Sequence, residues 1–191
     1  MTTAVASNQL LLACEPLSIY SFYSDVHRDV MPSWPIGQFG PLQPIEYRGS
    51  FGAMPTYQRK SVEDAFRTQT RNGRVWVGEL LEAKPAGVWT WFDEPIVLAK
   101  IAFSTRNDNS AVNQAPEEFD VIGTDDCTTD HFPAGMNLLH VSQAGFSSQG
   151  QEKEWEIPIR SRARFSCIGI FVRRARGSAN AALHNVRMWK N

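Results

Sequence analysis

The chain of 191 residues is 42% hydrophobic and 20% charged, which is the composition of a globular protein rather than a disordered one. Its apolar runs, such as Leu10–Cys14 and Ile96–Ala99, are far shorter than the roughly 18 residues that a membrane helix needs, so no transmembrane segment is predicted. The net charge of −1 argues against a basic nucleic-acid binder, and we expect no nucleic-acid partner.

Charge is unevenly distributed along the chain. No acidic residue follows Glu156, whereas eight basic residues do, so the rest of the chain is net acidic. The eight are Arg160, Arg162, Arg164, Arg173, Arg174, Arg176, Arg187 and Lys190. Two explanations stay open: a basic face for an anionic partner, or a basic segment that pairs with acidic residues of the same fold.

The N-terminal stretch before Glu15 has no basic residue and only a short apolar run, so a signal peptide is not predicted. The compartment therefore stays open between the cytoplasm and a location reached after removal of a leader. The three cysteines, Cys14, Cys127 and Cys167, show no C-x-x-C spacing, and an odd number gives little support to a disulfide framework. Cys167 lies in an apolar run, where we expect a buried thiol.

Residues 31–55 are rich in proline and glycine, which interrupt helices and strands, so we expect this stretch to be loop-like. It also carries Trp34, Phe39, Tyr47 and Phe51, which a solvated linker would not keep. The chain is therefore divided into a loop-rich N-terminal extension, residues 1–55, packed on the core or on a partner, and a main domain, residues 56–191.

The main domain favours strands. Ser61 and Asp64 resemble a capping box and predict one short helix over residues 61–67. Alternating apolar and polar residues predict several short strands. These strands are expected at 96–103, 119–121, 136–142, 155–159, 165–172 and 182–189. Many short strands with almost no helix predict an all-β fold, either a sandwich or a barrel.

Several motifs follow one another in a recognisable order. Residues 88–103 join two tryptophans to an Asp-Glu-Pro turn and an apolar strand; Arg106-Asn-Asp108 follows, and then residues 113–126 with a Pro-x-x-Phe-x-Val pattern. The chain closes with the apolar strand 165–172 and with 183–189, which ends in Trp189. This order resembles that of discoidin domains, also called coagulation-factor type C domains, of the galactose-binding-like superfamily. The resemblance covers roughly residues 60–190 and implies an antiparallel jelly-roll β-sandwich.

The resemblance also implies a function. Relatives that bind fucose or galactose do so on loops at one end of the sandwich, where an arginine of an R-x-D loop donates to sugar hydroxyls. We therefore expect a non-catalytic, lectin-like carbohydrate-binding or adhesion module, with Arg106, Asn107 and Asp108 on the ligand loop and Gln114 on its far side. A guanidinium offers several donors in a fixed fork, which suits hydroxyl ligands. The alternative is that Arg106 and Asp108 only brace a long surface turn.

Other residues are candidates for the same site. A second polar loop carries Arg71 and Arg74. It either contributes to the edge of the same ligand site or is a plain hairpin turn. The aromatic candidates for stacking on a sugar are Trp34, Trp76 and Phe39.

Some discoidin domains hold a structural calcium beside a turn that corresponds to Asp64. In this chain Asn185 stands where the family places a glutamate that closes the calcium site, which lowers the charge of the ligand set. Asp64 is the one metal candidate that the resemblance offers.

Two further functions stay open. The first is an oligomeric structural or carrier protein, whose aromatic-rich extension forms a homo-oligomer interface or binds an apolar small molecule such as a lipid or pigment. The second is binding of anionic phospholipid through Trp34, Phe39 and the C-terminal arginines. The resemblance, unlike the N-terminus, implies an extracellular location.

Catalysis is not predicted. The four histidines, His27, His131, His140 and His184, lack the H-E-x-x-H spacing of a metal site. Adjacent residues of a strand point to opposite faces, so Glu117 and Glu118 do not form a catalytic pair. No glycine-rich phosphate loop is present in the sequence, and we expect a protein that is not an enzyme.

Overall fold

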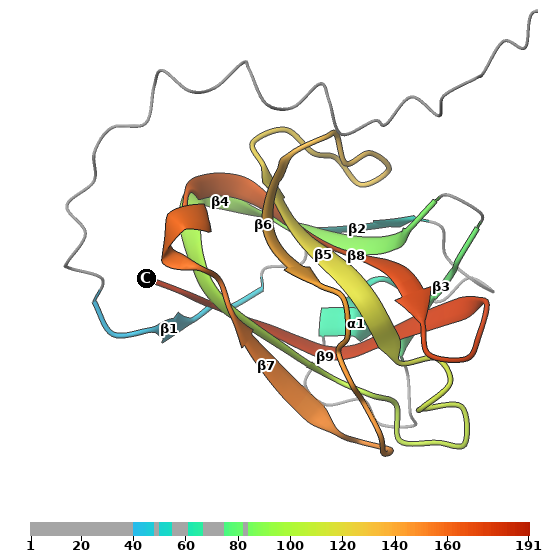
Figure 1. Ribbon diagram of the computed structural model, residues 1–191. Helices are drawn as coiled ribbons and strands as arrows, with labels where there is room; N and C mark the ends of the chain where they lie inside the picture. Colours follow the sequence, from blue (N-terminus) through green and yellow to red (C-terminus); the bar gives the residue numbers. More distant parts are fainter. Residues whose placement is uncertain (1–39, 48–49, 55–60, 67–74, 82–83) are drawn as a thin grey trace, which may run out of the picture. The chain divides into compact units, whose positions relative to one another are not determined.

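The computed structural model describes residues 40–47, 50–54, 61–66, 75–81 and 84–191, and residues 39–191 form one compact unit. Its strands are β1 (Gln43–Pro44), β2 (Phe51–Met54), β3 (Trp76–Glu79), β4 (Ala86–Ser104), β5 (Pro116–Thr124), β6 (Met136–Val141), β7 (Glu152–Glu156), β8 (Arg164–Ala175) and β9 (Asn180–Lys190) (Figure 1). The helical pieces are α1 (Glu63–Phe66) and the 3₁₀ turn η2 (Ile159–Ser161). Within the described ranges, no helix has the length and apolarity that a bilayer span requires.

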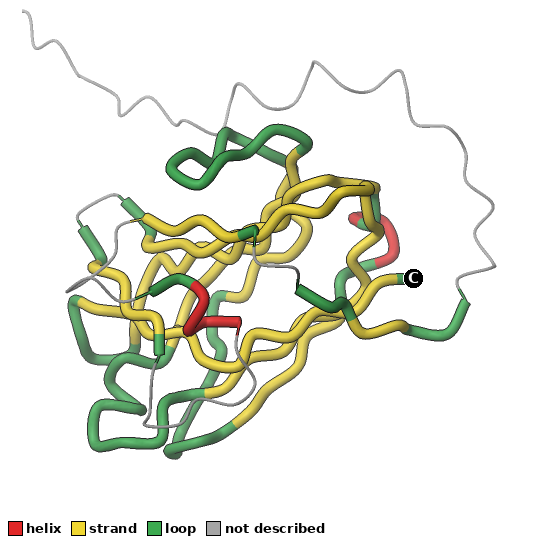
Figure 2. Tube along the Cα trace, turned by 180° about the vertical axis from the view of Figure 1, so that it is seen from behind, coloured by secondary structure: helices red, strands yellow, loops and turns green. Residues whose placement is uncertain are grey.

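The long strand β4 belongs to both layers of the fold. Its first part pairs with β2 and β8, and its last part pairs with β7 and β9, always antiparallel. The register with β8 shifts between Trp91 and Ile96, and from Leu98 onward the strand pairs with β9 of the other layer. One layer therefore runs β2-β4-β8-β5-β6, while in the other β9 pairs with β1, β3 and β4, and β7 pairs with β4. The predicted antiparallel β-sandwich is confirmed, and Figure 2 shows that strands and loops make up nearly all of it.

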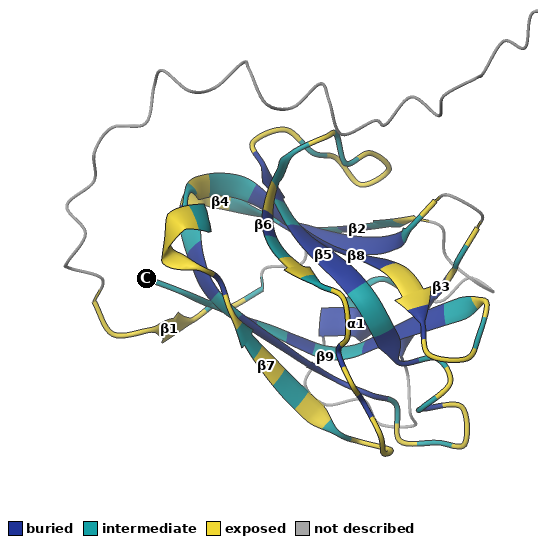
Figure 3. Cartoon of the chain, in the orientation of Figure 1, coloured by how far each residue is buried: buried dark blue, intermediate teal, exposed yellow. Residues whose placement is uncertain are grey.

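The core lies between the two layers and follows the alternation of the strands (Figure 3). In β8, Ile168, Ile170 and Val172 are fully buried on the core face. The opposite layer contributes Phe103, whose ring lies 5.1 Å from that of Phe119. Fully burying an aliphatic or aromatic side chain of this kind contributes about 1.5–3 kcal/mol, so these alternating residues fix which face of each strand is inside.

Most predicted elements of the main domain are found, with shifted boundaries. Helix α1 lies within the predicted 61–67, and β5, β6, β8 and β9 coincide with predicted strands. The strand predicted at 155–159 is observed as β7, three residues earlier, because Pro158 lacks an N–H for the ladder and the chain turns into η2.

The expectation that residues 31–55 lack strands is wrong for its described part. Strand β1 pairs with the end of β9, and β2 pairs with the first part of β4. Both are edge strands, where proline and glycine are tolerated: Pro44 ends the two-residue β1, and Gly52 lies opposite Trp89.

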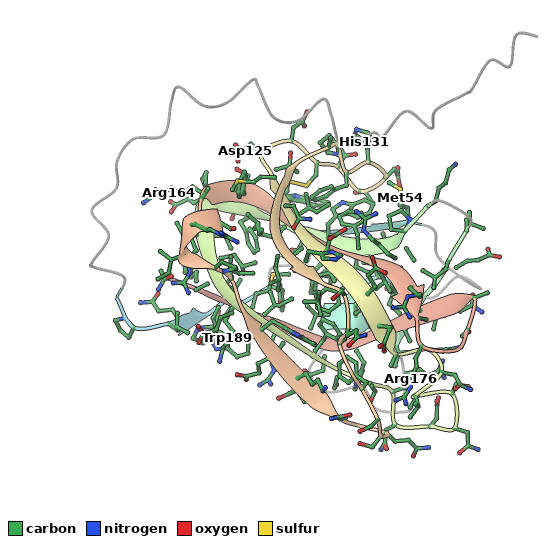
Figure 4. The ribbon with its side chains drawn as sticks, in the orientation of Figure 1. Met54, Asp125, His131, Arg164, Arg176 and Trp189 are labelled. Atoms are coloured by element: carbon green, nitrogen blue, oxygen red, sulfur yellow. A yellow bond between two sulfur atoms is a disulfide. The ribbon has the colours of Figure 1, made fainter. Side chains whose placement is uncertain are left out.

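The loop 125–135, between β5 and β6, folds back over the outer face of the layer β2-β4-β8-β5-β6. The indole Nε1 of Trp89 donates to the carbonyl of Thr128 at 2.7 Å, and the Phe132 ring lies 5.7 Å from that of Trp89. A disulfide joins Cys127 of this loop to Cys167 of β8. The expected buried thiol at Cys167 is therefore wrong, because the fold brings the two cysteines together across 40 residues of sequence. Asp125 and His131, at the top of Figure 4, mark this loop.

Candidate functional site

Three connections meet at one end of the sandwich: residues 105–115 between β4 and β5, 142–151 between β6 and β7, and 176–179 between β8 and β9. We call them together the loop rim. Backbone hydrogen bonds tie them, from Gly150 N to Arg106 O at 2.9 Å, from Gly177 N to Asn113 O at 3.0 Å and from Ala182 N to Gln114 O at 2.9 Å. Arg176, labelled at the lower right of Figure 4, lies on this rim and donates to the carbonyl of Phe146. The rim is thus a cross-linked surface rather than three separate loops.

Arg106 is the central charged residue of the rim, and its side chain is 20% exposed. Its Nε donates to Asp108 Oδ2 at 2.9 Å, its Nη2 donates to the same oxygen, and its Nη1 donates to Gln114 Oε1 at 2.6 Å. The other carboxylate oxygen of Asp108 accepts the backbone N–H of Ser110 at 3.0 Å. The structure therefore brings together the three predicted residues Arg106, Asp108 and Gln114, and fixes the direction of the guanidinium.

The arginine retains donor capacity after these bonds. A guanidinium carries five N–H groups, and the bonds above use three of them, so within the described residues two have no protein partner. Asp108 balances the charge of Arg106. The pair therefore braces the turn, as one explanation predicted, and still offers two directed donors.

Besides Arg176, the loops 105–115 and 142–151 of the rim carry exposed side chains that are neutral and form hydrogen bonds. They are amides and hydroxyls, among them Asn107, Asn109, Ser110, Asn113, Ser147, Ser148 and Gln149. Such groups act as both donors and acceptors, which matches ligands that carry several hydroxyls. The predicted Asn107 is among them and lies on the exposed side of the turn.

The predicted aromatic partner is not found among the described residues. Trp76 is fully buried in the core, where β3 packs against β9, and so cannot stack on a ligand. The single aromatic residue of the rim, Phe146, is also fully buried. Trp34, Phe39, Arg71 and Arg74 lie outside the described residues, so their assignments stay predictions.

The metal candidate Asp64 lies in α1 and is 6% exposed. Within the described residues, no three His, Cys, Asp or Glu side chains come together as a metal-binding group. Asn185, where the family places glutamate, has a left-handed backbone with φ of 54° and donates through its amide to Glu152 at 3.2 Å. The calcium site at Asp64 therefore stays a prediction.

The basic C-terminal segment pairs largely within the fold. Arg173 donates to the carboxylate of Asp120, which is 1% exposed, and Arg187 forms an ion pair with Glu152. Arg162 donates to the carbonyl of Ile157 and to the side chain of Asn191. Since a buried carboxylate needs such partners, these contacts favour the explanation that the basic segment balances the acidic part of the same domain.

Two of the histidines take part in polar contacts of the sandwich. His140 lies 2.8 Å from Asp120 through its Nδ1, on the outer face of β5 and β6. His184 lies beside the end of β4, with its Nδ1 3.1 Å from the hydroxyl of Ser104. Burial lowers the pKa of His184 below its ordinary value of 6.5, so the imidazole is neutral at physiological pH.

The turn 147–151 is a part of the rim that the sequence motifs did not identify. Its side chains lie far from Arg106 in sequence, and long-range hydrogen bonds bring the two segments together. The one local signal is Gly150, whose φ of 62° is a left-handed conformation that glycine adopts without strain.

Comparisons with known proteins agree with this architecture. No family model and no curated protein matches the sequence. Among solved structures, an F5/8 type C domain of a Bacteroides fragilis protein matches with a TM-score of 0.62 and 9% identity, covering 80% of this chain and 98% of that one. A Streptococcus pneumoniae fucose-binding module matches with a TM-score of 0.54 and 14% identity, covering 81% of this chain and 100% of that one.

A third match adds a glycan complex. It comprises the tandem family 32 carbohydrate-binding domains of Clostridium perfringens ZmpB, solved with GalNAc, at a TM-score of 0.56 and 15% identity. The match covers 78% of this chain, which spans 35% of that longer one. At such identities the likeness establishes the fold alone: the chain has the antiparallel β-sandwich fold of these F5/8 type C and family 32 carbohydrate-binding domains.

Proposed function

We propose that this chain is a non-catalytic carbohydrate-binding module that recognises a sugar with its loop rim. The observation that carries the proposal is the arrangement of Arg106, which Asp108 and Gln114 hold in place while two of its N–H groups have no partner within the described residues. The same rim carries exposed amides and hydroxyls. Its neighbours in fold include carbohydrate-binding modules that were solved in complex with GalNAc and with galactose.

The chemistry of a sugar fits this arrangement. Each hydroxyl of a sugar both donates and accepts hydrogen bonds, so a site needs donors and acceptors side by side. Arg106 supplies donors, and the amides of Asn107 and Gln114 supply both kinds of group. Because Asp108 balances the charge of Arg106, the pair provides direction without net charge, which suits a neutral sugar.

A single site of this kind binds weakly, and adhesion through it gains from several copies acting together. We include in the proposal that the chain acts as a homo-oligomer or as one of several binding domains. Sedimentation of the purified chain measures the first of these directly.

The test is an NMR titration of ¹⁵N-labelled protein with galactose, GalNAc and fucose, each added separately. We expect the amide signals of residues 106–114 and 147–150 to shift with at least one sugar. Arg106→Lys keeps the charge but loses the fork, and is expected to weaken binding about tenfold or more, the effect of losing one to two charged hydrogen bonds.

The matched control is Arg162→Lys, which removes another hydrogen-bonded arginine at the opposite end of the sandwich and should bind as the wild type does. If no rim amide shifts with any of the three sugars, the proposal is wrong. Binding of phosphatidylserine vesicles by such a protein would then favour the phospholipid alternative, and co-purified lipid or pigment would favour the carrier alternative.

A further inference from the structure

Thr105 is a buried residue that immediately precedes Arg106 on the rim. Its side chain is 1% exposed, yet its hydroxyl makes two hydrogen bonds across to the turn 147–151. It donates to the carbonyl of Ser148 at 2.9 Å and accepts the backbone N–H of Gln151 at 3.0 Å. The backbone N–H of Thr105 also donates to the carbonyl of Gln151 at 2.9 Å. One threonine therefore joins two segments that are more than 40 residues apart in sequence.

Gln151 closes the turn on its other side. Its side-chain oxygen Oε1 accepts the backbone N–H of Ser147 at 2.7 Å and that of Ser148 at 3.4 Å. The hydroxyl of Ser147 lies 3.3 Å from the same oxygen. The side chain of Gln151 thus accepts hydrogen bonds from two backbone N–H groups of the turn, which would otherwise lack a partner in a strand or helix.

Arg106 lies between these contacts. On its N-terminal side Thr105 is fixed to the turn, and on its C-terminal side its own carbonyl accepts the N–H of Gly150 at 2.9 Å. The same turn therefore holds the backbone of Arg106 from both sides, independently of the bonds that Asp108 and Gln114 make to the guanidinium.

We propose that Thr105 and Gln151 are positioning residues, which set the place of Arg106 for the ligand by locking the turn 147–151 to the β4–β5 loop. This inference rests on the proposed function, because it concerns the affinity of the same site. Thr105 is buried, so its effect on binding is carried by Arg106 and not by contact with the sugar. Fixing a binding group before the ligand arrives lowers the entropy lost on binding.

The test uses Thr105→Val, which keeps the shape of the side chain and removes both hydroxyl bonds. Thr105→Ser keeps the hydroxyl and is the rescue variant. The matched control is Thr90→Val, because Thr90 is a buried threonine whose hydroxyl also donates to a loop carbonyl, that of Ser50, at 2.9 Å, but in the β2-β4 pairing away from the rim.

Two readouts are measured well below the melting temperature: the dissociation constant for the sugar that binds best, and the hydrogen-exchange rate of the Gly150 amide. We expect Thr105→Val to weaken sugar binding roughly tenfold and to speed exchange at Gly150, and Thr105→Ser to restore both. Thr90→Val is expected to lower the melting temperature by a similar amount to Thr105→Val, with no effect on either readout.

The outcomes separate this inference from the proposed function. If the wild-type protein binds sugar and Thr105→Val binds equally well, the positioning role is wrong and the function stands. If Thr90→Val weakens binding as much as Thr105→Val does, the effect is one of general stability, and the positioning role is again wrong. If the wild-type protein binds none of the sugars, the proposed function fails and takes this inference with it, whatever the exchange rates show.

Discussion

Gly52 of β2 lies beneath the indole of Trp89 on the neighbouring strand. A Cβ atom at this position would meet the Trp89 Nε1 at 2.2 Å and the carbonyl oxygen of Thr129 at 2.5 Å. Such distances are too short for any side chain, and both neighbours are held: the indole is hydrogen-bonded to Thr128, and the oxygen belongs to backbone. Because Gly52 has no side chain, the loop 125–135 can lie directly on the sheet at this position.

Gly52→Ala is predicted to destabilise the protein by about 1–3 kcal/mol, the usual cost of overpacking a filled site. Urea denaturation measures the change. The control is Gly40→Ala, since a Cβ at Gly40 meets no atom within 4 Å, and this variant should unfold as the wild type does. Equal stability of the two variants would contradict the packing argument.

At the scale of elements, the loop 125–135 depends on three kinds of contact. The Cys127–Cys167 disulfide ties it near its start, the bond from Trp89 to Thr128 holds its turn, and Phe132 packs on the ring of Phe171 at 4.9 Å. The disulfide stabilises the fold mainly because it closes a long loop in the unfolded chain and so lowers the conformational entropy of the unfolded state.

Replacing both cysteines, Cys127→Ala with Cys167→Ala, is predicted to lower the free energy of unfolding by roughly 3–4 kcal/mol, as expected for closure of a loop of this length. Exchange of the Trp89 indole proton, followed by NMR, should become faster because its acceptor lies on the loop. A variant with unchanged stability and exchange would show that the loop needs no disulfide.

The sequence predicts elements best where one strand carries its own pattern. Residues 165–172 are apolar on both faces, and β8 is indeed covered by the core on one side and by the loop 125–135 on the other. Strands β2 and β3, with four residues each, carry too little alternation to stand out and are defined by their partners β4 and β9. The local sequence pattern therefore predicts a central strand such as β8, whereas the short strands β2 and β3 are determined by pairing with their neighbours.

The same distinction applies to the site. The R-x-D motif placed Arg106 and Asp108 together, since they are two residues apart, and the family resemblance added Gln114. The turn 147–151 and the pairing of Cys127 with Cys167 depend on contacts between segments far apart in sequence, which no local motif encodes. Trp76 is a candidate from sequence because tryptophan suits both a core and a sugar site, and its burial in the structure decides for the core.

At the scale of the whole molecule, residues 39–191 form one compact unit, and its described part contains a hydrophobic core whose buried residues run from Ala65 to Met188. A chain shortened to residues 39–191 is therefore predicted to unfold in one cooperative transition, with the melting temperature of the full chain. Differential scanning calorimetry of the two proteins measures this. A broad transition, or one at clearly lower temperature, would mean that residues 1–38 complete the fold.

Strand β9 begins at the loop rim, where Ala182 bonds to Gln114, and ends at Lys190, opposite Gln43 of β1. Its 11 residues place these two ends roughly 30 Å apart. Asn191 lies within hydrogen-bond reach of the carbonyl of Gly40. Gly40 and Asn191 therefore lie side by side, at the end of this unit away from Arg106. When the protein is anchored to a sensor chip or a bead through Asn191, the rim therefore points away from the anchor and faces the solution.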